Sequence, residues 1–206
     1  MVKVKKIGDM LINVERDRYL RKLAEKENIL SENKEILDFG CGEGFVMDLF
    51  NKWGANPHFL TGVYISDKRI SNAKLIFPKF NFFLIDNSLP FEDEKFSAII
   101  VSTVFSSIRN KQERAFWASE LTRVLKSNGV IIFYDMKINN PFNAKTKKVL
   151  LSDLKDLFNG YEINHWTLTV WPHFARLISK FSIKLYSVMT KFKFLHTHFI
   201  ASLVKK

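Results

Sequence analysis

The sequence predicts an α/β fold in which helices cover both faces of a mostly parallel sheet, and two observations support this prediction. Short apolar runs of strand length alternate along the chain with segments whose apolar residues recur every three or four positions. One apolar run leads into closely spaced glycines that precede a helical segment, as in a parallel sheet with crossover helices. We expect strands at 35–39, 58–65, 81–85, 96–104, 130–134, 162–170 and 198–204, and helices at 16–30, 45–53, 66–77, 112–126, 151–158 and 174–192.

Turn and cap residues set several of these boundaries. Gly54 ends the helix at 45–53, and Ser66 caps the next helix, which Pro78 stops. The pair Asn128-Gly129 suits a left-handed C-cap for the long helix at 112–126. The strand at 198–204 is expected at an edge of the sheet.

Length and composition predict one domain. The chain has 206 residues, of which 47% are hydrophobic, enough for one sizeable core. We divide the domain into a helical lead-in at 1–34, a ligand-binding core at 35–140 and a substrate and cap region at 141–206. The apolar run at 10–12 is too short for a signal peptide, and no stretch has the length of a spanning helix, so we expect a cytoplasmic protein. A single cysteine, Cys41, excludes an internal disulfide and a cysteine-based zinc site, and we expect no metal.

The net charge of +11 is concentrated in the last third of the chain, where residues 141–206 carry 11 Lys or Arg and 3 Asp or Glu. This excess of positive charge has two possible explanations. One is a compositional bias with solvated charges, and the other is an anionic partner. Within it, residues 174–192 predict a basic amphipathic helix. Apolar positions at helical spacing are more often core, which favours a lid packed on the sheet. The alternative is a peripheral surface for an anionic membrane or a lipid-linked substrate.

The strongest local signal is Ile-Leu-Asp-Phe-Gly-Cys-Gly-Glu-Gly at 36–44. Gly40, Gly42 and Gly44 let a ligand approach the main chain, and the following helix offers free N–H groups to it. A dinucleotide fingerprint needs Gly or Ala where Phe45 stands, so a nicotinamide or flavin cofactor is disfavoured. Asp38, at the end of the strand, can face a positively charged amino group of the ligand; its alternative role is to cap the turn.

In five successive segments covering about residues 33–136, the sequence resembles the class I methyltransferases that depend on S-adenosylmethionine (SAM). The matching segments are 37–44, 61–66 with 72–74, 83–86 with 89–93, position 96, and 120–126 leading to Gly129. This resemblance implies a Rossmann-like three-layer αβα sandwich with a mostly parallel seven-stranded sheet whose last strand is antiparallel. It also implies SAM as the cofactor and S-adenosylhomocysteine as its product.

The resemblance further implies which residues bind the cofactor. The glycine loop and Asp38 hold the methionine end, and Asp86 accepts a hydrogen bond from the adenine amino group. The complete set expected to bind the cofactor is Asp38, Gly40, Cys41, Gly42, Gly44, Tyr64, Ile65, Asp86, Asn87, Ser102 and Thr103.

Tyr64 departs from the family pattern, which places an acidic residue at the end of the second strand to bind both ribose hydroxyls. A phenol offers one oxygen and cannot make that bidentate contact. Asp67 can reach the ribose from the helix start, or the Tyr64 ring can stack on the adenosyl group. Weaker SAM binding is therefore an open expectation.

The candidate catalytic residues are Asp135 as general base, Tyr134 beside it, and His173, followed by His198. All lie at or near expected strand ends, where this topology places its site. In the alternative interpretation Asp135 caps the following loop and the histidines lie on the surface.

A narrower resemblance links segments 104–108, 133–135, 139–141, 168–172 with 175–176, and 195–198 to methyltransferases associated with polysaccharide and surface-glycan biosynthesis. It implies a methyltransferase (EC 2.1.1.-) that acts on a small-molecule, glycan or lipid-linked acceptor, at oxygen. Methylation of RNA is a disfavoured alternative, because the partly matching Asn-Pro-Phe at 140–142 follows the wrong strand and lacks a second proline. Nucleic acid is therefore not an expected partner. A non-catalytic SAM-binding protein is the other alternative.

Overall fold

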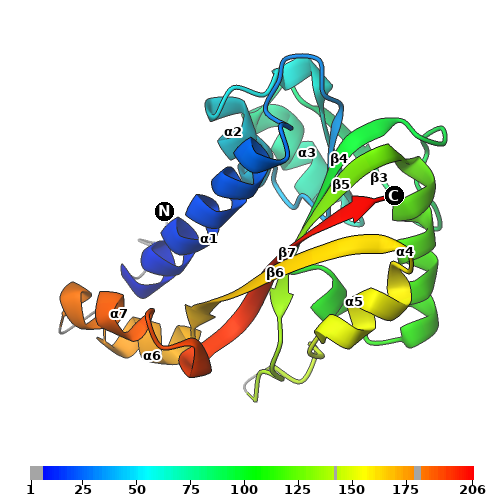
Figure 1. The fold of residues 1–206 in the computed structure, drawn as a ribbon. Coiled ribbons are helices and arrows are strands. Elements are labelled where there is room, and N and C mark those ends of the chain that lie inside the picture. Colours follow the sequence, from blue (N-terminus) through cyan, green and yellow to red (C-terminus); the bar gives the residue numbers. More distant parts are fainter. Residues whose placement is uncertain (1–6, 142, 179–181) are drawn as a thin grey trace.

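A computed structural model describes residues 7–141, 143–178 and 182–206, and it contains one twisted sheet of seven strands with helices on both faces (Figure 1). The strand order across the sheet is β3-β2-β1-β4-β5-β7-β6. The strands are β1 (Ile36–Phe39), β2 (Leu60–Tyr64), β3 (Asn81–Leu84), β4 (Phe96–Ser102), β5 (Leu125–Met136), β6 (Tyr161–Val170) and β7 (His196–Lys205).

Two layers of helices cover the sheet because its strands are apolar on both faces. On one face, a core that includes Leu23, Met47 and Ile70 packs on β1, β4 and β5 beneath the first three helices. On the other face, Leu121 and Leu154 belong to the core beneath the next two helices. The helices are α1 (Ile7–Lys26), α2 (Phe45–Lys52), α3 (Asp67–Ile76), α4 (Lys111–Val124), α5 (Leu151–Leu157), α6 (Pro172–Ile178) and α7 (Ile183–Met189).

The pairing of the strands confirms the predicted fold class. Strands β1 to β5 pair in parallel, and β7 pairs antiparallel with both β5 and β6. The expectation that the last strand lies at an edge is wrong, because β7 lies between β5 and β6. Its residues are buried from His196 to Leu203, as expected for a strand with a neighbour on each side and helices on both faces.

The boundaries of α1 and α4 differ from those predicted. The described part of helix α1 begins at Ile7 rather than Arg16, and the helix contacts both α6 and β6. Helix α4 ends at Val124, and Leu125 already pairs with Phe96 in the sheet. Asn128 has the predicted left-handed conformation, with φ of 61°, but it lies in an irregularity of β5 rather than at a helix end.

The helix predicted at 174–192 is also different. Two short helices, α6 and α7, replace it, and residues 179–181 between them lie outside the described residues. Both helices project from the end of the sheet beside the start of α1 (Figure 1). In the described part of the chain, no helix is long and apolar enough to cross a membrane.

Candidate functional site

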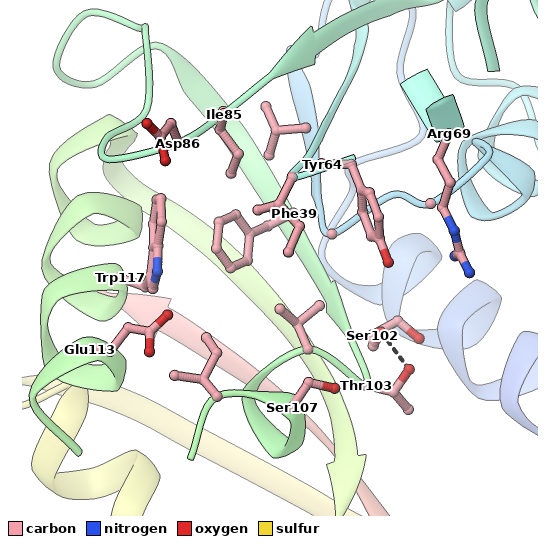
Figure 2. A pocket seen from close by; sticks show the side chains of 16 residues that line it. Phe39, Tyr64, Arg69, Ile85, Asp86, Ser102, Thr103, Ser107, Glu113 and Trp117 are labelled. Atoms are coloured by element: carbon pink, nitrogen blue, oxygen red, sulfur yellow. Dashed lines mark hydrogen bonds between the residues drawn. The ribbon is translucent and has the colours of Figure 1, made fainter. Parts of the chain in front are cut away.

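A cavity of about 360 Å³ opens where four parallel strands end (Figure 2). Its walls come from the carboxyl ends of β1, β2, β3 and β4, together with the start of α4. In the sheet order, β1 lies between β2 and β4, so the cavity is at the point where the chain switches from one side of β1 to the other. This is where open α/β sheets bind their ligands.

The glycine loop forms the floor of the cavity. Gly40, Gly42 and Gly44 all have positive φ, at 83°, 58° and 86°, a conformation that glycine adopts without steric cost. A Cβ on Gly42 would meet only the Arg69 guanidinium, at 3.5 Å, so its Cα faces open space beside the ligand cavity. A Cβ on Gly40 would strike Val104, and one on Gly44 would lie 2.8 Å from the Phe82 ring. Gly40 and Gly44 therefore permit packing, whereas Gly42 leaves room for a ligand.

Tyr64 and Arg69 form one wall. The Arg69 guanidinium lies 5.3 Å from the centre of the Tyr64 ring, and the two side chains extend side by side from β2 and α3 (Figure 2). A cation above an aromatic face is attracted by the negative charge of that face. Sequence reasoning missed Arg69, although its position one turn into a helix that follows the strand was a usable signal.

The opposite wall carries Asp86 after β3 and two side chains of α4 (Figure 2). The Asp86 carboxylate is exposed, and its Oδ2 accepts a hydrogen bond from the Asn87 amide at 3.0 Å. Glu113 and the buried Trp117 line the cavity from α4. Neither was predicted, because the apolar stripe of α4 indicates core contacts and gives no sign that its first turns reach a ligand.

The end of β4 completes the cavity. Ser102 and Thr103 both line it, and the Thr103 hydroxyl donates to the Ser102 carbonyl oxygen at 2.7 Å (Figure 2). Thr103 has a φ of 56°, which is strained for a β-branched residue and is typical of functional sites. Its amide donates to the Tyr134 carbonyl oxygen at 2.7 Å, which holds this backbone in place.

The cavity thus brings together seven of the predicted cofactor residues, namely Gly40, Gly42, Tyr64, Ile65, Asp86, Ser102 and Thr103. Four others do not line it. Cys41 faces a smaller neighbouring cavity of about 270 Å³, and burial raises the pKa of its thiol well above the usual range. Asn87 contacts Asp86 instead of the cavity, and Gly44 packs on Phe82. The fourth is Asp38.

Asp38 lies in β1, two residues before Gly40, and does not line the cavity. It is 2% exposed, and its Oδ2 has no hydrogen-bond partner among the described residues. Burial raises the pKa of this carboxyl group to about 7, against a smaller lowering by Arg16. A buried carboxylate oxygen without a donor is costly, and a cationic ligand group would satisfy it. Of the two carboxylates expected to bind the cofactor, Asp86 lines the cavity and Asp38 does not.

The structure places the candidate catalytic residues Asp135 and Tyr134 outside the cavity, because neither residue lines it. Asp135 is fully buried, and its two oxygens accept the amides of Ser106 and Met136 at 3.0 and 2.8 Å. The alternative interpretation had Asp135 cap the loop that follows it; the structure shows that it accepts the amide of the next residue and also holds the loop after β4 through Ser106. Tyr134 points to the other face of the sheet, as its neighbouring strand position requires, and its hydroxyl lies 2.9 Å from the Thr169 hydroxyl.

The two candidate histidines are also away from the cavity. His173 is exposed at the start of α6, with its ring against Trp171. His198 was expected on the surface but is 7% exposed in β7, where its ring stacks on Tyr134 with centres 5.1 Å apart. Burial lowers the pKa of His198 to about 4, so it is neutral at pH 7.

Comparison with known proteins adds to this geometry. Residues 37–133 match the family described as "Methyltransferase domain". A sterol 4-C-methyltransferase of Caenorhabditis elegans, strm-1, is 34% identical over 133 residues, which are 61% of this chain and 38% of that protein. The uncharacterized methyltransferase YodH of Bacillus subtilis (strain 168) is 28% identical over 145 residues, 66% of this chain and 55% of that protein. The chain thus spans about half the length of these relatives or less.

Among solved structures, a putative sarcosine dimethylglycine methyltransferase from Galdieria sulphuraria has a TM-score of 0.70 with 16% identity, over 94% of this chain and 86% of that one. At this identity, the likeness shows the fold. Residues 37–133 thus match a methyltransferase domain, the likeness to the solved structure shows its Rossmann-like fold, and both support SAM as the cofactor. The glycine floor, the exposed Asp86 and the unsatisfied Asp38 fit that cofactor.

Proposed function

We propose that this chain is a SAM-dependent methyltransferase that transfers a methyl group to a hydroxyl oxygen of a small-molecule, glycan or lipid-linked acceptor. The observation that carries the proposal is the cavity at the ends of β1 to β4, where Gly42 faces open space opposite Asp86. A buried core fills the rest of the sheet. The carboxyl edge of the sheet is therefore the region where a ligand has room to bind.

The residues of the cavity divide by the part of the cofactor that they suit. Asp86 would accept a hydrogen bond from the adenine amino group, and the apolar Ile85 and Trp117 lie on the same side of the cavity (Figure 2). Tyr64 stands at the end of β2, where its single hydroxyl would meet the ribose. Asp38 would accept hydrogen bonds from the amino group of the methionine end, because its free oxygen needs a donor.

Bound SAM supplies an activated methyl group on a sulfonium sulfur, so what the protein must contribute is chiefly position and exclusion of water. Ser102 and Thr103, with their backbone fixed by Tyr134, hold the β4 edge of the cavity. Asp135 holds the loop that follows through the Ser106 amide. We propose no side chain as general base, since the cavity does not include Asp135, Tyr134 or His173.

The acceptor class rests on two supports. The short segments at 104–108, 133–135 and 168–172 resemble methyltransferases of polysaccharide and surface-glycan biosynthesis. The relative from Caenorhabditis elegans is described as acting on a sterol carbon, which also favours a small-molecule or lipid acceptor over a nucleic acid. The resemblance to glycan methyltransferases favours an oxygen atom as the acceptor, whereas the sterol relative is described as acting on carbon. We favour oxygen because of the resemblance.

A second candidate function is a SAM-binding partner subunit without transfer activity, and Tyr64 is the observation that favours it. Without the carboxylate that the family uses to bind the ribose, SAM binding would be weaker. Weaker SAM binding suits a protein that does not have to transfer methyl groups. This candidate and the enzyme both require the cavity to bind SAM, and they differ in methyl transfer.

The test combines calorimetry with a transfer assay. The purified chain is titrated with SAM and S-adenosylhomocysteine, and then incubated with methyl-labelled SAM and a panel of sugar nucleotides, lipid-linked glycans, sterols and RNA. Incorporation into a glycan or lipid-linked acceptor supports the proposal, and incorporation into RNA contradicts its acceptor class. Binding without incorporation across the panel supports the partner subunit. Absence of binding overturns both candidates.

A further inference from the structure

Apolar side chains of the C-terminal helices lie on the surface instead of in the core. We define the C-terminal apolar face by the exposed residues of α6, α7 and the segment that follows them. Phe194 is 80% exposed and Leu177 is 53% exposed. The face comprises Phe174, Leu177, Ile183, Leu185, Val188, Phe192 and Phe194.

Ring contacts and a groove make part of this face continuous. The Phe192 and Phe194 rings have centres 5.8 Å apart, and those of Trp171 and Phe174 are 5.3 Å apart. Phe174 and Phe194 both line an apolar groove of about 290 Å³ with Met189 between α6 and β7. Residues on two helices and the following turn thus share one surface.

The opposite side of the two helices attaches them to the protein. Ala175 and Tyr186 are buried with Val170 in a small core, against Leu11 and Ile12 of α1. The lid interpretation required the apolar stripe of 174–192 to be core, and it is wrong for the residues of the apolar face. These residues stay exposed while the inner side of each helix is already packed.

Exposed charges on α7 and the segment that follows it are positive. Lys184, Lys191 and Lys193 are exposed on or beside the C-terminal apolar face. No Asp or Glu follows Glu162 in the sequence, whereas seven Lys or Arg do. Asp9 of α1, which lies near α6, is paired with Arg176 at 2.7 Å. Exposed apolar side chains with lysines beside them are complementary to a lipid bilayer, which has an apolar interior and can carry anionic headgroups.

We propose that the C-terminal apolar face docks on an anionic lipid bilayer. Phe and Leu side chains would enter the interface, and the three lysines would meet lipid headgroups. The direction of β6 places the face relative to the cavity. Because β7 is antiparallel to both β5 and β6, β6 runs in the same direction as β1–β5. Since α6 follows the carboxyl end of β6, the face lies at the same edge of the sheet as the cofactor cavity. A membrane-held acceptor would therefore approach from the side on which the cavity opens.

Vesicle flotation of the whole chain tests this proposal without relying on methyl transfer. Vesicles of phosphatidylglycerol and phosphatidylcholine are compared with vesicles of phosphatidylcholine alone, at low and high salt. We expect binding to the anionic vesicles that decreases as salt rises. No flotation with anionic vesicles at low salt overturns the proposal, whatever the transfer assay shows.

Surface variants with matched controls locate the binding. Phe194→Ser should weaken binding by about tenfold, because one large apolar side chain no longer enters the interface. Leu75→Ser is its control, since Leu75 is 82% exposed on α3 at the other end of the molecule (Figure 1). Replacing Lys184, Lys191 and Lys193 by Glu should weaken binding by about a hundredfold, whereas the same change at exposed Lys68, Lys74 and Lys79 should not.

Equal binding by the Phe194→Ser and Leu75→Ser variants would overturn the assignment of the face. A second copy of the chain is the competing occupant, and light scattering distinguishes it. If the protein is a dimer that Phe194→Ser converts to a monomer, and neither form floats with vesicles, the face is an interface between copies and the membrane proposal fails.

Discussion

The guanidinium of Arg69 lies 5.3 Å from the centre of the Tyr64 ring, on the wall of the cofactor cavity. This pair occupies the end of β2, where the family resemblance leads one to expect a carboxylate. A cation and a ring cannot reproduce the bidentate contact of a carboxylate with two hydroxyls. They can orient each other, and the cation also lies close to Gly42.

Arg69→Ala should weaken binding of S-adenosylhomocysteine by about threefold to tenfold, because the Tyr64 ring loses its cation–π partner and the cavity loses a positive charge. Calorimetry measures the change. Arg18→Ala is the matched control, since Arg18 lies 5.7 Å from the centre of the Tyr19 ring on α1. A similar loss of affinity in both variants would show that the effect is general destabilisation.

Gly42→Val should abolish detectable cofactor binding, because the new side chain would extend into the space beside the cavity. The positive φ of Gly42 also makes any side chain strained there, so the control must carry the same strain. Gly160→Val does so, with φ of 84° and no atom within 4 Å of a new Cβ. If both variants lose thermal stability equally and both still bind the cofactor, Gly42 does not border the ligand.

The affinity for S-adenosylhomocysteine should fall as pH decreases below about 7. Burial raises the pKa of Asp38 to about 7, and only the ionised carboxylate can pair with the ammonium of the ligand. If the ligand binds only when the Asp38 carboxyl group is ionised, the affinity should fall about tenfold for each pH unit below that value. Calorimetry between pH 5.5 and 8 checks it. Asp38→Asn should bind weakly and without this pH dependence, whereas Asp86→Asn should keep the pH dependence while binding more weakly.

The same carboxyl group should make the free protein less stable as pH rises. Since its pKa is about 7 in the folded chain and 3.8 as the ordinary value, the folded state binds the proton more tightly. The free energy of unfolding therefore falls between about pH 4 and pH 7. Asp38→Asn should be more stable than the parent at pH 8, by up to about 4 kcal/mol, and nearly equal at pH 4. Urea denaturation at both pH values measures this, and a constant difference would refute the assigned ionisation.

Asp135→Asn should destabilise the fold by about 1–3 kcal/mol, because one of the two oxygens that accept backbone amides becomes an NH₂ group. Cofactor binding and turnover should fall together, since the loop that Asp135 holds leads from the cavity wall at Thr103. Asp153→Asn is a milder control, because Asp153 accepts the Leu150 amide at an exposed helix start. A loss of turnover with stability and binding unchanged would restore Asp135 as a catalytic candidate.

The sequence predicted the cofactor half of this protein better than the rest. Residues 36–44 combine an apolar strand with closely spaced glycines, and in the structure Gly42 lines the cavity. Strand ends are also local features, so Tyr64, Asp86, Ser102 and Thr103 could be placed on one edge once the strands were recognised. The fold class, including the antiparallel last strand, followed from the resemblance.

Features that depend on long-range packing could not be read in this way. Trp117 and Glu113 reach the cavity only because of how α4 lies on the sheet. Asp135 and Tyr134 are adjacent in sequence, but neighbouring strand positions point to opposite faces, and neither side chain lines the cavity. The apolar spacing at 174–192 indicated a core helix, whereas the structure shows two short helices with much of that stripe exposed.

The position of β7 between β5 and β6 has a consequence for synthesis on the ribosome. Strand β6 is translated before its partner, and in the described sheet it pairs only with β7. While residues 196–205 are still being added, β5 lacks one neighbouring strand and β6 has none. Such unpaired strand edges are liable to pair with other chains. The five parallel strands that carry the cofactor cavity can assemble earlier. Removing the segment from His196 onward should therefore leave a species prone to aggregation, not a smaller folded protein.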